Sequence, residues 1–319
     1  MTTTGKRERL MVPEAEFRSY YGRQIVKSPT WKVPDVPAYL YLGGMAGVSA
    51  CLAALADATG RPALRKVGRL AAAGGASVSV VALVHDLGRP ARFLNMLRVV
   101  KPTSPLSVGS WILAPFGTAA AAAAASELTG VAPRLGRIAG MGAGVLGPAL
   151  TTYTAVLLTN TAVPAWHEVH RELPYVFAGS AMASGGGIGL LAGSSTPVRR
   201  VALAGAALEL GGMAVLERRA GFVGSAYRDG RAGRVLRAAR AATVVGALGV
   251  AAGGRLRTTW LSAAGGLLLN AGSAALRYGI FAAGMASSRD PSHVVVPQRE
   301  RLDTVDNDAV VAPSALDHP

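Results

Sequence analysis

The sequence predicts an all-α integral membrane protein, built as a bundle of eight transmembrane helices. Half of its 319 residues are hydrophobic, only 16% are charged, and the mean hydropathy is +0.34. The charges occur in clusters, and the stretches between clusters suit a helix of about 20 residues that crosses a hydrocarbon core. A secreted or cytosolic globular domain is excluded by these three observations.

Five uncharged windows predict the clearest membrane spans, and three weaker stretches complete the set of eight. The five windows cover residues 36–56, 102–126, 138–166, 173–198 and 258–276, and the weaker stretches cover 70–84, 201–216 and 235–253. The spans are rich in Ala and Gly rather than Leu, which favours closely packed helices.

Two polar segments flank the predicted membrane domain of residues 36–288. Residues 1–35 form an N-terminal arm with Tyr20, Tyr21 and Trp31, which suits either docking on a partner or simple disorder. The first span follows this long arm, so it is not expected to be a cleavable signal. Residues 289–319 form a polar C-terminal tail, expected to be extended.

Redox cofactors held by the chain itself are not expected. The single cysteine, Cys51, cannot form an internal disulfide or ligate an iron–sulfur cluster, so such a cluster would belong to another subunit. A bis-histidine haem needs facing histidines inside the membrane, and only His85 could reach the edge of the core. His167 and His170 have metal-ligand spacing but lack a convincing third ligand, so no metal is predicted.

The formal net charge of +15 does not indicate nucleic-acid binding, because the basic residues stand at helix ends. Anionic lipid and an acidic partner surface are the expected counterparts. Lys and Arg also predict the orientation. The face that carries both termini holds 22 of these residues and the other face holds 10, so the termini are predicted to be cytoplasmic in the plasma membrane.

The segment of residues 85–111 is unusually polar for a connection between two spans. A plain hinge needs only small turn-forming residues, whereas this one begins with His85 and Asp86 and carries several basic side chains. One interpretation is an interfacial loop anchored at the headgroups. The more specific interpretation is that this segment forms the opening of a polar pocket, which binds and protonates a ligand that arrives from the lipid.

Two buried charges are expected at one depth. Glu209 lies roughly 10 Å, and Arg277 roughly 12 Å, inside the face that carries the termini, at a rise of about 1.5 Å per residue. An unpaired charge there would cost several kcal/mol, so an ion pair is predicted. The opposite half of the bilayer is expected to be apolar, which argues against a transporter with a site near the midplane.

Three groups of residues resemble the NrfD / polysulfide reductase membrane-subunit family. They are His85-Asp86-Leu87-Gly88-Arg89-Pro90 with its continuation through Lys101-Pro102 to Gly109-Ser110-Trp111, then Tyr41-Leu42-Gly43-Gly44-Met45-Ala46-Gly47, and finally Leu276-Arg277-Tyr278 with Ser288-Arg289-Asp290-Pro291 and Val296-Pro297-Gln298-Arg299. Together these pieces span nearly the whole chain.

The resemblance implies an eight-helix subunit without a cofactor of its own that binds menaquinone or ubiquinone as substrate. It further implies an iron–sulfur (ferredoxin-like) partner and, usually, a molybdopterin catalytic subunit, with electrons passing between the quinone and the nearest cluster. The substrate of the partner enzyme does not carry over. Some relatives place Asn and His at the start of the first helix, where this chain has Asp35 and Tyr39.

Quinone reduction needs donors to two carbonyl oxygens and a group that passes protons. His85 suits proton exchange at neutral pH, and Asp86 could orient its imidazole. Tyr39 and Tyr153 could donate hydrogen bonds to a carbonyl, and Trp111 could stack on the ring or serve as an anchor. The remaining predicted quinone contacts are Asp35 and Arg89.

Two other functions stay open. Glu209 and Arg277 could line the path of a small-solute or ion transporter. Alternatively, the chain could be a purely structural anchor that holds soluble subunits on the membrane. In none of these roles does the chain carry out chemistry by itself.

Overall fold

The computed structural model describes residues 24–89, 91–193 and 195–311, and the regular structure within them is helical. The bundle consists of eight long helices, one for each predicted span. They are α1 (Asp35–Ala58), α2 (Pro62–Leu87), α4 (Pro105–Thr129), α5 (Pro133–Thr159), α7 (Leu173–Gly189), α8 (Thr196–Arg219), α10 (Gly230–Arg255) and α11 (Thr259–Ser287). Short elements lie in the connections: α3 (Ala91–Met96), α6 (Pro164–Glu168), η1 (Leu190–Ala192), η2 (Gly221–Gly224) and α9 (Ser225–Arg228).

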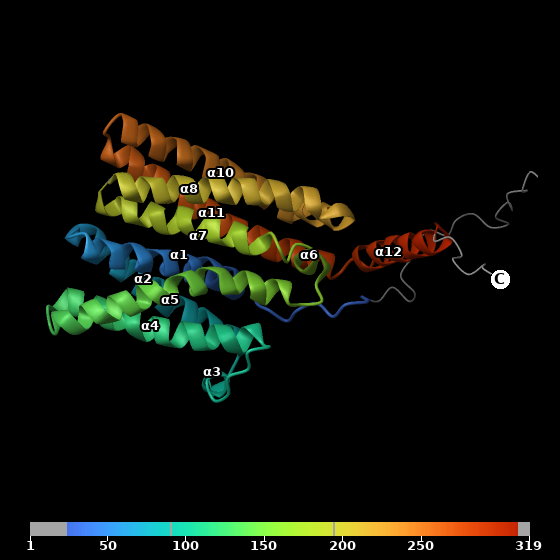
Figure 1. Ribbon diagram of the computed structural model, residues 1–319, viewed down its shortest axis with the longest axis horizontal. Coiled ribbons are helices and arrows are strands. Elements are labelled where there is room, and N and C mark those ends of the chain that lie inside the picture. The colour runs from blue at the N-terminus through green and yellow to red at the C-terminus, as the bar shows by residue number, and fades with distance from the viewer. Residues whose placement is uncertain (1–23, 90, 194, 312–319) are drawn as a thin grey trace, which may run out of the picture.

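The long helices form two groups that meet at α1 and α7 (Figure 1). In one group α1, α2, α4 and α5 pack together, and in the other α7, α8, α10 and α11 do so. Contacts of α7 with α1 and α5, and of α11 with α1, join the groups. We call the end of the bundle where α1 begins and α2 ends the terminal face, because the first described residues and α12 both lie there.

Small residues let the helices approach closely, as predicted. A methyl group on Gly47 of α1 would lie 2.6 Å from the carbonyl oxygen of Gly147 on α5. A methyl group on Gly187 of α7 would lie 2.5 Å from the carbonyl oxygen of Gly266 on α11. Both crossings therefore require glycine, which is how Ala- and Gly-rich spans associate without large side chains.

The all-helical membrane architecture is confirmed, but a count of eight transmembrane helices is not. Six helices in the described part of the chain are long and apolar enough to cross a membrane: α1, α2, α4, α5, α7 with η1, and α10. The other two long helices, α8 and α11, carry the buried charges Glu209 and Arg277 within their length. Charged and polar residues lower the apolar character of a span even where the helix is continuous.

Two of the predicted spans differ in their bounds from the observed helices. The span expected over 138–166 stops at Thr159, and Pro164 begins the separate helix α6. The span expected over 235–253 begins earlier, because Arg231 and Arg234 already lie on the first turns of α10, which runs from Gly230 to Arg255. Arg and Ala favour helix strongly, so an Arg/Ala-rich segment continues a helix rather than a linker.

The C-terminal tail was expected to be extended, and this prediction is wrong for the described residues. Helix α12 (Ser292–Val311) follows α11 after a short turn and projects away from the bundle (Figure 1). Polarity alone does not prevent a helix, because Glu, Gln, Arg and Leu are all good helix formers. Of the N-terminal arm, only residues 24–35 belong to the described part, so Tyr20 and Tyr21 lie outside it.

Candidate functional site

At the terminal face, the start of α1 meets the end of α2. Asp35 is the first residue of α1, and His85 stands in the last turn of α2, which ends at Gly88 in the left-handed conformation (φ +70°). The imidazole Nδ1 of His85 lies 2.6 Å from Oδ2 of Asp35. The His85 side chain is 72% exposed and that of Asp35 is 13% exposed. The pair thus connects the aqueous surface with the interior of the bundle.

Asp86 does not contact the imidazole, contrary to its predicted orienting role. Its Oδ1 atom accepts a hydrogen bond of 2.7 Å from the backbone N–H of Lys32, whose Nζ donates to the carbonyl oxygen of His85. The reason is geometric, since consecutive helical residues point about 100° apart. Asp86 therefore ties the N-terminal arm to the end of α2, and Asp35 is the carboxylate beside His85.

Deeper in the same region, two tyrosines face each other. Tyr39 lies one turn after Asp35 on the same face of α1, and its ring contacts that of Tyr153 on α5 edge to face, with centroids 6.3 Å apart. Both side chains are buried. The hydroxyl of Tyr153 has no hydrogen-bond partner among the described residues. A buried donor without a partner is costly, so it marks a place where a ligand acceptor would be stabilised.

Gly109 of α4 explains how the Tyr153 ring fits. A methyl group at Gly109 would overlap the ring, so the absence of a side chain there creates the space that Tyr153 occupies. Gly109 belongs to the motif that resembles the NrfD family, but only the structure shows that it leaves space for the Tyr153 ring.

The other predicted residues of the hinge lie further out. Arg89 is exposed beyond the end of α2, and the chain continues into α3, which lies beside the bundle at the start of α4 (Figure 1). Trp111 is 42% exposed on α4. The structure thus brings together Asp35, Tyr39, His85 and Tyr153 but leaves Arg89 and Trp111 at the surface.

Glu209 and Arg277 share a depth, but they do not form the predicted direct ion pair. Both pack against the same turns of α7: the Nη2 atom of Arg277 donates to the carbonyl oxygen of Phe177, and the backbone of Glu209 lies against Gly179. The Oε1 atom of Glu209 accepts from Thr243 instead. Both side chains are buried, so the attraction between their opposite charges is only weakly screened. Arg277 also stacks on the Phe177 ring, 3.6 Å from its centroid.

The arm is held by an aromatic stack that the sequence did not predict. Trp31 stacks on Trp166, with centroids 5.5 Å apart, and on Phe281 of α11. Trp166 is fully buried, and its indole N–H donates to the carbonyl oxygen of Ile280. Burial raises the pKa of the neighbouring Tyr227, whose hydroxyl donates to the carbonyl oxygen of Ala165.

Beside this stack is an open pocket of about 690 Å³, lined by residues of the arm, α9, α10, α11 and α12. His293 lies in its wall, with Nε2 3.1 Å from the hydroxyl of Ser225 and Nδ1 3.5 Å from Asp290. Burial works to raise the pKa of Asp290, but hydrogen bonds from Ser292 and the nearby His293 lower it below its ordinary value. These contacts fix the start of α12 against the bundle.

No group of three or more His, Cys, Asp or Glu side chains within the described residues is arranged to hold a metal ion. His167 and His170 stack on each other, and their Nδ1 atoms lie near backbone carbonyl oxygens.

The described features agree with one known family. Its model, described as "Polysulphide reductase, NrfD", matches residues 24–202. This range includes the Asp35–His85 pair, Tyr39, Tyr153 and Gly109. No curated protein matches the chain. Because the match covers more than half of the sequence, the chain belongs to the NrfD (polysulphide reductase) family and is a membrane subunit of the oxidoreductase type.

Proposed function

We propose that this chain is the quinone-reactive membrane subunit of a multi-subunit oxidoreductase. The observation that carries the proposal is the buried hydroxyl of Tyr153, which lacks a partner and stands beside Tyr39 and below the Asp35–His85 pair. A quinone carbonyl oxygen is an acceptor without a proton of its own, so it matches this unsatisfied donor.

The proposed chemistry joins two electrons and two protons with a quinone to form a quinol, or the reverse. The electrons would be exchanged with an iron–sulfur partner, since this chain has a single cysteine and cannot ligate a cluster. Protons would pass between water and the pocket through His85 and Asp35, because the first is exposed and the second is largely buried. Menaquinone and ubiquinone both have the required carbonyl pair.

The partner would bind at the terminal face. The first turns of α10 carry Arg231, Arg234, Arg237 and Arg240, and α12 projects from the same end. This arrangement suits an acidic surface on a ferredoxin-like subunit, with a molybdopterin catalytic subunit beyond it. The chain would thus anchor both partners while it exchanges their electrons with the membrane pool. Eight crossings, with α8 and α11 included, are part of this proposal.

Tyr153→Phe tests the proposal with little change in packing. The hydroxyl has no partner to lose within the described protein, so the variant should assemble normally. Loss of one hydrogen bond of about 0.5–1.5 kcal/mol should raise the KM for quinol about three- to tenfold. Turnover with an artificial soluble acceptor should be unchanged, because that path bypasses the pocket. Unchanged quinol kinetics would remove the main support for this site.

A transporter remains the alternative that a specific observation favours, because Glu209 and Arg277 are buried within the membrane domain. Reconstituted vesicles distinguish the two functions. Solute or ion flux without a redox partner, together with failure to bind quinol analogues, would favour transport.

A further inference from the structure

At the end of the bundle opposite the terminal face, five charged side chains converge. Arg65 and Arg69 of α2 each contact Asp57 of α1 and Glu127 of α4, with distances of 2.9–3.4 Å, and Arg137 of α5 lies 3.3 Å from Asp57. The sequence placed ten Lys and Arg residues on this face but did not predict that some of them form a cluster with two carboxylates. The cluster draws on four helices, so no single stretch of sequence displays it.

The cluster contains one more positive charge than its own carboxylates neutralise. Asp57 and Glu127 are balanced by Arg65 and Arg69, and the Arg69 side chain is only 7% exposed. Arg137 is therefore in excess, and its side chain is 66% exposed. Two arginines would be enough to neutralise the two carboxylates and to hold the helices together. The third leaves the site with a net positive charge, which attracts an anion.

Two cavities meet at Asp57 and Arg137. One has a volume of about 180 Å³ and is lined by all five charged residues. The other is a groove of about 710 Å³ between α1 and α5, and apart from Asp57 and Arg137 its walls are apolar or weakly polar: Cys51, Ala54, Leu55, Ala58, Met141, Gly144 and Val145. Leu55, Met141 and Val145 are 62%, 57% and 79% exposed, so the groove opens on the outer surface of the bundle.

The direction of the groove matches the direction of a lipid in a bilayer. Its charged end lies where α1 ends and α5 begins, which is the level of the membrane surface. From there it follows α1 back to Cys51, roughly 10 Å toward the bilayer interior at about 1.5 Å per residue. The lining of the groove thus changes from charged residues at the membrane surface to apolar residues toward the bilayer interior, as a lipid does from its headgroup to its acyl chains.

We propose that this site binds an anionic phospholipid, with its phosphate on Arg137 and one acyl chain in the groove between α1 and α5. The excess positive charge selects an anionic headgroup, and the apolar walls select a molecule with a tail rather than free phosphate. The site is separate from the quinone site at the terminal face and does not depend on it.

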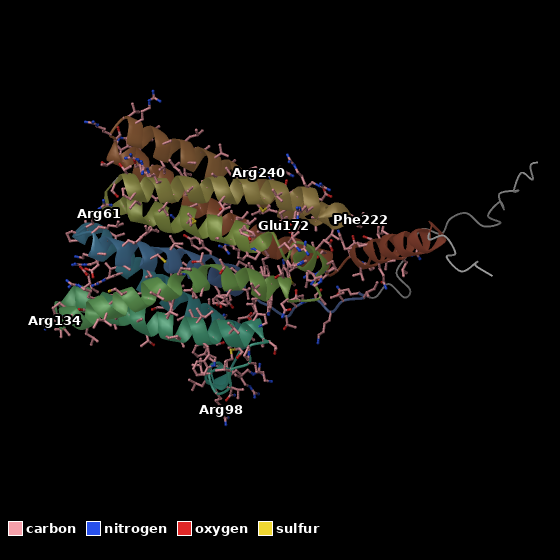
Figure 2. All side chains as sticks on the ribbon, in the orientation of Figure 1. Arg61, Arg98, Arg134, Glu172, Phe222 and Arg240 are labelled. Carbon is pink, nitrogen blue, oxygen red and sulfur yellow. The ribbon has the colours of Figure 1, made fainter. Side chains whose placement is uncertain are left out.

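Native mass spectrometry of the assembled complex, transferred into nanodiscs of mixed phosphatidylglycerol and phosphatidylcholine, measures the bound lipid. The wild type should retain one phosphatidylglycerol at this site. Arg137→Gln should lower that retention about fivefold, as expected for one basic residue at an anionic surface. Arg134→Gln is the matched control, because Arg134 is exposed at the same end of α5 but lines neither cavity (Figure 2).

A second pair of variants tests the groove. Met141→Trp should fill it and lower retention, whereas Ile138→Trp places the same ring on an exposed position of α5 outside the groove and should not. Equal retention across both pairs would overturn the proposal. So would displacement of the lipid by inorganic phosphate alone, which would show an anion site without a lipid, or preferential retention of quinone.

Discussion

The imidazole of His85 and the carboxylate of Asp35 are in hydrogen-bond contact at 2.6 Å, although 50 positions separate them in the chain. One side chain is in water and the other is almost inside the bundle. The exposed imidazole is thereby connected to the side of the bundle in which Tyr39 and Tyr153 are buried. In this arrangement Asp35 is a residue of the proposed proton path, and Asp86 is a tether for the arm.

Substitutions of the two aspartates should therefore have different effects. Asp35→Asn should lower quinone-linked turnover about 10²-fold or more, as is usual for a positioned acid–base group, and His85→Gln should do the same. Asp86→Asn keeps an acceptor for the N–H of Lys32 and should change turnover less than threefold. The measurement is paired activity, quinone against a soluble acceptor, at verified complex content. A larger loss in Asp86→Asn than in Asp35→Asn would contradict this assignment.

Gly109→Ala should displace the Tyr153 ring, since the new methyl group would overlap it. The KM for quinol should rise at least as far as in Tyr153→Phe, because a displaced ring carries its hydroxyl away from the quinone carbonyl. Gly117→Ala on the same helix is the control, because a methyl group there has open space around it. Equal activity of the two alanine variants would show that the position of Tyr153 does not matter for turnover.

Glu209 and Arg277 should be coupled in stability without direct contact. Neutralising either one leaves a buried charge without its counterpart, so Arg277→Met and Glu209→Gln should each lower the thermal stability of the complex in detergent. The double variant should recover about 0.5–3 kcal/mol of the summed loss, the usual range for coupled sites. Arg200→Met, at an exposed position of α8, is the control. If the stability losses of the two single variants are strictly additive in the double variant, Glu209 acts independently of Arg277, for example as a proton relay.

The termini should face the cytoplasm, because Lys and Arg are concentrated on that side of the membrane. A cysteine-reactive label that cannot cross membranes should leave a cysteine placed in the C-terminal tail unmodified in intact cells. A cysteine in the connection between α4 and α5 should be labelled, since that connection lies at the opposite end. Labelling of the tail alone would reverse the orientation.

The sequence by itself determined the class, the positions of eight long helices and the family. Long uncharged stretches can satisfy their backbone groups in a bilayer only as helices, so composition is decisive there. It also indicated the terminal face as the place of the site, because His85, Asp35 and Tyr39 all stand at helix ends on that side. The motif around Gly109 carried the family resemblance without revealing its physical purpose.

Only the tertiary structure decided which of these side chains meet. His85 contacts Asp35 rather than its neighbour Asp86, Gly109 makes room for Tyr153, and the charges of four helices meet around Asp57 and Glu127. The physical reason is the same in each case. Periodicity along a chain determines which face of a helix is apolar, but the rotation and crossing of packed helices determine which polar residues face one another.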